Sequence, residues 1–69
     1  SWDRKVKVES LKPEMSYAQQ ISALKDEVLT GNLTPKEGET LTNIVRTQAQ
    51  VEQADEIERR LKALEEKNK

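Results

Sequence analysis

The sequence predicts an all-α protein, an antiparallel helical hairpin with a long second helix, and three observations support this class. Two helix-start signals, Ser16 to Gln19 and Thr34 to Glu37, lie a short distance apart in the chain. Apolar residues after each signal recur at spacings of three and four, as on one face of a helix. An alternating stretch near the N-terminus has no second strand-like segment to pair with, which favours an extended arm over a sheet.

The composition restricts the protein to one small domain without thiol or imidazole chemistry. The chain has 69 residues, of which 33% are hydrophobic, and it contains neither Cys nor His. A chain of this size builds only a modest core and is usually reinforced by disulfides, metals or oligomerisation. The absence of Cys and His excludes disulfides, thiolate or imidazole metal sites and His-based catalytic triads. We therefore expect a non-enzymatic protein without cofactors that gains stability as a homo-oligomer.

The charge balance gives no reason to expect a nucleic-acid or membrane surface across the whole chain. Twelve basic and 13 acidic side chains leave a net charge of -1. A nearly neutral chain produces no strong overall field to attract phosphates. The sequence also lacks a run of about 20 apolar residues and the basic-then-apolar plan of a signal peptide. We expect a soluble, cytoplasmic protein that does not enter a membrane.

Residues 1–14 are predicted to form an extended arm or linker, and residues 15–69 the hairpin and oligomerisation unit. Pro13 ends the arm. Apolar and basic residues alternate within it: Trp2, Arg4, Lys5, Val6, Lys7 and Val8. The alternative to an arm is a strand that another subunit completes.

The first predicted helix begins after Ser16 and ends near Gly31. Ser16 and Gln19 have the spacing of a capping box, in which each side chain bonds the backbone amide of the other. Gly31 can adopt the left-handed conformation that commonly ends a helix, and Leu33 follows where an apolar side chain folds back onto the helix end.

The second predicted helix begins at Pro35 and continues to Glu66. Thr34 suits the N-cap, Pro35 the first helical position and Glu37 the third position of a capping box. No Pro interrupts the segment, and its single Gly, Gly38, lies in the first turn, where its low helix propensity costs least. Oppositely charged side chains four residues apart support the C-terminal half of this helix. These pairs are Glu56 with Arg60, Glu58 with Lys62 and Lys62 with Glu66.

The apolar residues of the second helix divide into two groups on nearly opposite sides. The first group faces the first helix, so the predicted hairpin core consists of Tyr17, Ile21, Leu24, Val28, Leu41, Ile44, Val45 and Val51. The second group extends beyond the shorter helix and is the predicted oligomer or partner interface: Ala54, Ile57, Leu61 and Leu64. In the alternative arrangement, these distal residues bend back and are covered by Trp2, Val6 and Val8.

Acidic side chains are frequent in the second helix but do not indicate an active site. They are Glu52, Asp55, Glu56, Glu58, Glu65 and Glu66. Without histidine or an enclosing pocket they are typical of a solvated helix face. We predict neither catalytic nor metal-binding residues.

The arm carries the one basic stretch with an aromatic residue. Its possible nucleic-acid contacts are Trp2, Arg4, Lys5 and Lys7, which pair a stacking ring with phosphate-binding cations. Neighbouring acids at Asp3 and Glu9 weaken this pattern. The second hypothesis is therefore a nucleic-acid-binding module, and the third is an adaptor hairpin that binds a different protein.

About half of the chain carries a recognisable pattern of helix-start and apolar residues. It comprises Leu33-Thr34-Pro35-Lys36-Glu37-Gly38, Leu41, Ile44-Val45, Gln48 and residues 56–65. This pattern resembles a helical region near the end of phage-associated proteins, including small terminase subunits. The resemblance implies a ring- or oligomer-forming DNA-packaging protein, in which this portion supports assembly or contacts the large terminase subunit. The first thirty residues do not share it, and the basic DNA-recognition segment of a small terminase is absent.

The connection between the predicted helices has the sequence Gly31-Asn32-Leu33-Thr34 and is followed by Glu37. This motif resembles that of short C-terminal oligomerisation hairpins. Both resemblances imply assembly, and neither implies a chemical reaction.

Overall fold

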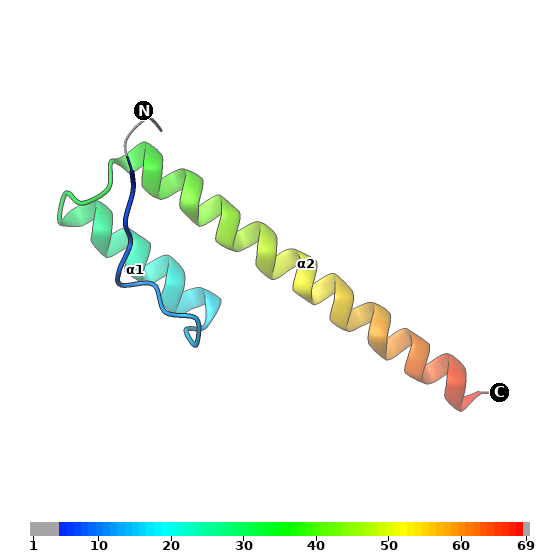
Figure 1. The fold of residues 1–69 in the computed structure, drawn as a ribbon. Coiled ribbons are helices and arrows are strands. Elements are labelled where there is room, and N and C mark those ends of the chain that lie inside the picture. The colour runs from blue at the N-terminus through cyan, green and yellow to red at the C-terminus, as the bar shows by residue number, and fades with distance from the viewer. Residues whose placement is uncertain (1–4, 69) are drawn as a thin grey trace.

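The protein is a two-helix hairpin with one arm much longer than the other. A computed structural model describes residues 5–68, in which α1 spans Tyr17–Leu29 and α2 spans Pro35–Lys67. The two helices run antiparallel, and α2 continues far past the start of α1 (Figure 1). The molecule is accordingly elongated, with dimensions of 56 × 21 × 15 Å. Residues 5–68 contain no strand, so the predicted all-α hairpin with a long second helix is confirmed.

Both helices begin with the predicted capping boxes. The Gln19 amide donates to Ser16 Oγ at 3.1 Å, and the Ser16 amide donates to Gln19 Oε1 at 2.9 Å. The same reciprocal pair joins Thr34 and Glu37, at 3.1 Å and 2.9 Å. These bonds satisfy amides that the first turn of a helix leaves without intrahelical partners.

Replacing Thr34 by Ala should lower the free energy of unfolding by about 1 kcal/mol, the usual cost of losing an N-cap side chain. The loss of stability should be measurable because Glu37, whose amide donates to the Thr34 hydroxyl, is only 1% exposed, so water cannot readily replace that bond. Urea denaturation followed by circular dichroism measures the change. Thr34→Ser, which keeps the hydroxyl, is the matched control and should retain most of the stability. An Ala variant as stable as the parent protein would show that the box contributes nothing.

The connection between the helices is a tight glycine turn followed by a buried leucine. Gly31 has φ 86°, and its amide donates to the Val28 carbonyl at 3.1 Å while the Asn32 amide donates to the Glu27 carbonyl at 3.0 Å. This pair of bonds is the Schellman arrangement, for which glycine at C′ is the usual residue. The apolar contact that accompanies this arrangement is usually made by the residue directly after C′, here Asn32. Leu33 lies one residue further along, and its side chain is 2% exposed. The connection therefore supplies a core residue as well as a turn.

The core lies between the two helices and the arm. Its buried residues are Leu24 of α1, Leu33 of the connection and Val45 of α2. Partly buried side chains pack around them: Val6, Val8, Leu11, Tyr17, Ile21, Val28 and Leu41. Three of these come from the arm, which runs along the hairpin in Figure 1. The arm is therefore a third layer of the core rather than a separate segment.

Two residues predicted for the hairpin core lie outside it. Ile44 and Val51 are 58% and 55% exposed. The side of α2 that is buried or partly buried instead follows Gly38, Leu41 and Val45 and continues to Ala49. A single short helix covers only a narrow face of its neighbour, and Ile44 lies about 100° around α2 from Val45. The core beside α1 instead includes Leu33 and apolar side chains of the arm.

Gly38 allows α1 and α2 to approach each other closely. A Cβ atom at this position would lie 2.3 Å from Val28 Cγ2, well inside van der Waals contact. The glycine is thus required by packing, whereas the sequence indicated only that its cost in the first turn is small.

Candidate protein-interaction surface

The hairpin ends where the first residue of α1 meets the middle of α2. The Tyr17 hydroxyl donates a hydrogen bond to the Glu52 carboxylate, which also accepts from Gln48 Nε2 at 3.0 Å. Beyond Glu52, α2 runs on alone to Lys67 (Figure 1). Nearly all of its side chains there are exposed. We call residues 53–67 the distal half of α2.

The Tyr17–Glu52 hydrogen bond shifts the titration of both groups. The bond raises the pKa of the Tyr17 hydroxyl, and loss of hydration acts in the same direction. It lowers the pKa of Glu52, to which Gln48 contributes as well. The neutral hydroxyl and the ionised carboxylate are therefore the forms that the folded hairpin favours.

We expect the hairpin to lose stability at both ends of the pH range through this pair. Glu52 has a depressed pKa, so its contribution to stability is present above the ordinary glutamate pKa and is lost as the pH falls through the pKa of the folded state. Tyr17 has a raised pKa, so its contribution to stability is lost as the pH rises through the pKa of the folded state. Thermal unfolding across pH measures this. Glu52→Gln should reduce both dependences, and Glu39→Gln is the control on the same helix. Unchanged pH profiles in Glu52→Gln would contradict the assignment.

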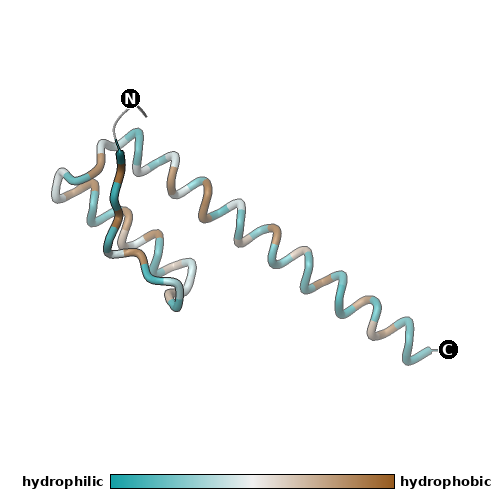
Figure 2. Tube along the Cα trace, viewed as in Figure 1, coloured by the Kyte–Doolittle hydropathy of each residue, from teal (hydrophilic) through white to brown (hydrophobic). Residues whose placement is uncertain are grey.

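Apolar side chains continue along the distal half although nothing in the described chain covers them. Figure 2 shows hydrophobic positions recurring nearly to the end of α2. Ile57, Leu61 and Leu64 are 50%, 54% and 56% exposed, and Ala54 is exposed as well. An apolar stripe flanked by charges is typical of a helix that packs against another helix. The structure therefore places all four predicted interface residues on a free helix surface.

The arm does not cover this stripe. Val6 and Val8 pack against the hairpin core, and the alternative in which they shield Ile57, Leu61 and Leu64 does not occur among residues 5–68. Ile44 and Val51 share the exposure of the distal residues. The sequence held a sign that Ile44 and Val51 lie outside the hairpin core. At intervals of seven they are followed by the charged residues Glu58 and Glu65. Such a series lies along one side of a coiled-coil helix.

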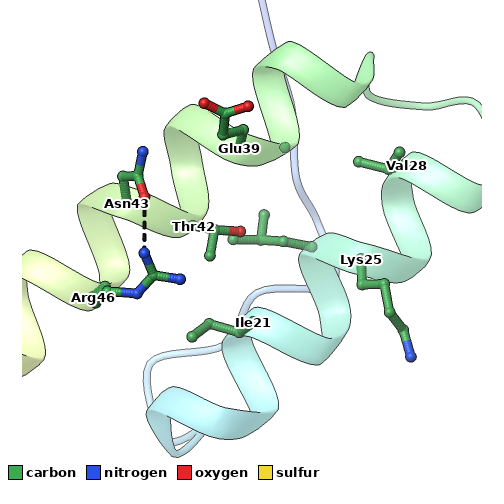
Figure 3. A pocket seen from close by; sticks show the side chains of 9 residues that line it. Ile21, Lys25, Val28, Glu39, Thr42, Asn43 and Arg46 are labelled. Atoms are coloured by element: carbon green, nitrogen blue, oxygen red, sulfur yellow. Dashed lines mark hydrogen bonds between the residues drawn. The ribbon is translucent and has the colours of Figure 1, made fainter.

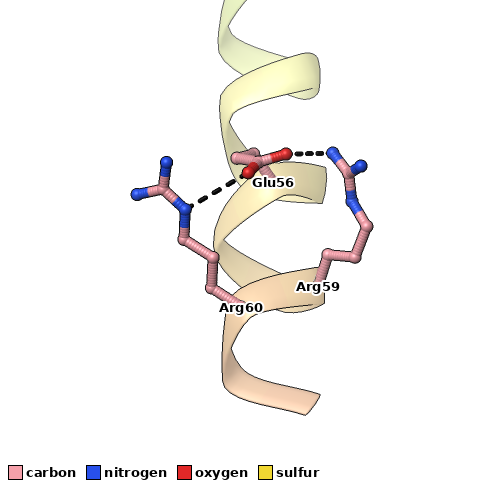
Figure 4. Close-up of polar contacts among 3 residues, drawn as sticks. All are labelled: Glu56, Arg59 and Arg60. Carbon is pink, nitrogen blue, oxygen red and sulfur yellow. Dashed lines mark hydrogen bonds and ion pairs between the residues drawn. The ribbon is translucent and has the colours of Figure 1, made fainter. Parts of the chain in front are cut away.

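Charged residues beside the stripe are paired within the helix. Glu56 binds both Arg59 and Arg60, the latter through Nε at 3.2 Å (Figure 4). Lys62 Nζ lies 3.4 Å from Glu58 Oε1. Exposed pairs of this kind contribute only about 0.3–0.5 kcal/mol each. These charged side chains contribute little to stability, but they border the apolar stripe on both sides.

The arm is attached to the hairpin through polar contacts at Glu27. Ser10 Oγ donates to Glu27 Oε1 at 3.2 Å, and Asn32 Nδ2 donates to the same carboxylate and to the Lys7 carbonyl, the latter at 3.2 Å. Lys5 and Lys7 are exposed, whereas Trp2 and Arg4, also predicted to contact nucleic acid, lie outside the described residues. Nucleic-acid binding by the arm stays a prediction.

A shallow groove lies between the two helices, and in the view of Figure 3 the arm passes behind it. Ile21, Val28 and Thr42 form part of its wall, and Arg46 donates to Asn43 at its edge at 3.2 Å. The groove is open, and its charged lining residues Lys25, Glu39 and Arg46 form no ion pair with one another.

Residues 5–68 hold no group of three acidic side chains arranged to bind a metal ion. Neither α1 nor α2 has a stretch long and apolar enough to cross a membrane. Comparison with protein-family models, with curated proteins and with solved structures finds no match to this chain. The candidate functional surface is the exposed stripe on the distal half of α2, because its apolar side chains are uncovered in the described chain.

Proposed function

We propose that this chain is a non-enzymatic helical assembly module that associates with copies of itself through the distal half of α2. The observation that carries the proposal is the exposure of Ile57, Leu61 and Leu64 on a helix that no other described residue covers. Helices with such stripes bury them against another helix in water, because about 25 cal/mol is gained per Å² of apolar surface removed.

The small core is the second support for self-association. Only Leu24, Leu33 and Val45 are buried apolar residues among residues 5–68. A core of this size supplies few kcal/mol, and no cysteine is present to add a disulfide. Association would add stability to the hairpin that a single chain forms.

Sedimentation equilibrium over a range of protein concentrations tests the proposal. We expect the average mass to rise above that of the 7.9 kDa chain as the concentration increases. A chain that stays monomeric at about 0.5 mM, the weak end of specific association, would contradict self-association. The adaptor hypothesis would then become the leading one, with the same stripe binding a different protein.

A role in phage DNA packaging stays a hypothesis based on the sequence resemblance. The resembling residues 56–65 lie in the distal half of α2, so that the resemblance and the exposed stripe concern the same surface. Co-sedimentation with a purified large terminase subunit would test this more specific reading. Loss of that binding on changing Leu61 is the expected outcome, whereas no binding by the parent chain would remove the reading.

A further inference from the structure

The distal half of α2 has a heptad pattern that the exposed residues define. Ala54, Ile57, Leu61 and Leu64 are separated by three, four and three residues. This spacing is that of successive a and d positions, with Ala54 and Leu61 at a, and Ile57 and Leu64 at d. Each of these side chains is exposed in the single chain, so each is available for contact with the equivalent stripe of a second copy.

The flanking positions of this pattern are segregated by charge. In the same register the e positions are Glu58 and Glu65, both acidic, and the g positions are Arg60 and Lys67, both basic. One border of the stripe is therefore negative and the other positive. Residues at e and g lie across from the partner helix, where their charges influence orientation.

This segregation discriminates between the two possible orientations of the partner. In a parallel, in-register pair, each g residue faces the e residue five positions later in the partner, so Arg60 meets Glu65 of the second copy. In an antiparallel pair, g faces g and e faces e. Arg60 would then lie beside Arg60 or Lys67, and acidic residues beside acidic ones, which is unfavourable.

We infer that the distal halves of α2 associate as a parallel, in-register coiled coil stabilised by Arg60–Glu65 ion pairs between copies. This inference rests on the proposed self-association and adds the identity and orientation of the partner. It predicts that the hairpins of all copies lie at the same end of the assembly.

The contacts within one chain leave these residues able to form the new pair. Glu56 already binds Arg59 as well as Arg60, so Arg60 can turn toward a partner while Arg59 keeps the Glu56 charge compensated (Figure 4). The Arg60 side chain is 75% exposed. Among residues 5–68 the Glu65 carboxylate has no ion-pair partner. Pairing between copies therefore requires no buried bond to break.

Cysteine cross-linking determines the orientation directly, because the native chain contains no cysteine. Two variants, Ala54→Cys and Leu64→Cys, are mixed and oxidised at a concentration where the protein is associated. A parallel assembly joins position 54 to 54 and 64 to 64. An antiparallel assembly packs a positions against d positions and therefore joins 54 to 64; the mass of this mixed product identifies it, and finding it would overturn the inference.

Charge reversal tests the ion pair itself. Arg60→Glu should weaken association roughly tenfold, since each copy loses an attractive pair and gains a repulsive one. Adding Glu65→Arg to it should restore most of the affinity. Arg59→Glu is the matched control, because Arg59 binds the same Glu56 but lies at the outward f position. Failure of the double variant to recover, with helicity unchanged, would contradict the Arg60–Glu65 contact.

The two levels of the proposal fail in different ways. A monomeric parent chain would remove the self-association on which the inference depends. An associated chain with 54–64 cross-links would leave the proposed function intact and overturn only the parallel orientation.

Discussion

Leu61→Asp should abolish self-association while leaving the hairpin folded. Leu61 lies at the centre of the distal stripe and is 54% exposed in the single chain, so the substitution removes no core contact. In an assembly each copy would lose the burial of one leucine, worth about 1.5–3 kcal/mol, and would place a carboxylate in an apolar seam. Two copies together should weaken association by at least about a hundredfold. Sedimentation equilibrium measures the loss.

Ala63→Asp is the matched control for this experiment. It introduces the same carboxylate two residues away, at an exposed position about 160° around the helix from Leu61 when 100° is taken per residue. Circular dichroism should show equal helicity in both variants and in the parent chain. If Leu61→Asp associates as strongly as Ala63→Asp, the distal stripe is not the interface.

Gly38→Ala should destabilise the hairpin although alanine is the better helix former. Alanine gains about 1 kcal/mol over glycine within a helix. Its Cβ atom, however, would stand 2.3 Å from Val28 Cγ2, and the branched side chain of valine has few alternative rotamers. Overpacking of this kind costs about 1–3 kcal/mol and can cost more. We expect a net loss of about 2 kcal/mol, measured by urea denaturation at fixed protein concentration.

A double-mutant cycle identifies the cause of that loss. Val28→Ala removes the methyl group that the new Cβ would meet. In this background Gly38→Ala should be neutral or stabilising, because only the propensity gain is left. A Gly38→Ala effect that is the same in both backgrounds would show that the close contact is not responsible.

The two predictions concern different parts of the same helix. Near its start, α2 is held against α1 by a contact that tolerates no side chain at Gly38. Near its end, α2 carries the exposed stripe that Leu61 tests. The hairpin can thus be destabilised without altering the stripe, and the stripe can be changed without altering the hairpin.

Local sequence determined where the helices of this protein begin and end. The capping boxes at Ser16 and Thr34 form as expected, and Gly31 takes the left-handed conformation. These features were predictable because every bond involved joins residues only a few positions apart. The identity of the distal stripe was predictable for the same reason, since helical periodicity alone aligns Ile57, Leu61 and Leu64.

Tertiary structure alone decided which side of α2 faces the core. Ile44 and Val51 are as apolar as Val45, and periodicity could not show that α1 is too narrow to cover all three. It also could not show that the arm and Leu33 fill the space left beside α1, or that Gly38 touches Val28. These outcomes depend on how much surface distant segments bring to one place, and that quantity is set by packing between elements rather than by the sequence of any one of them.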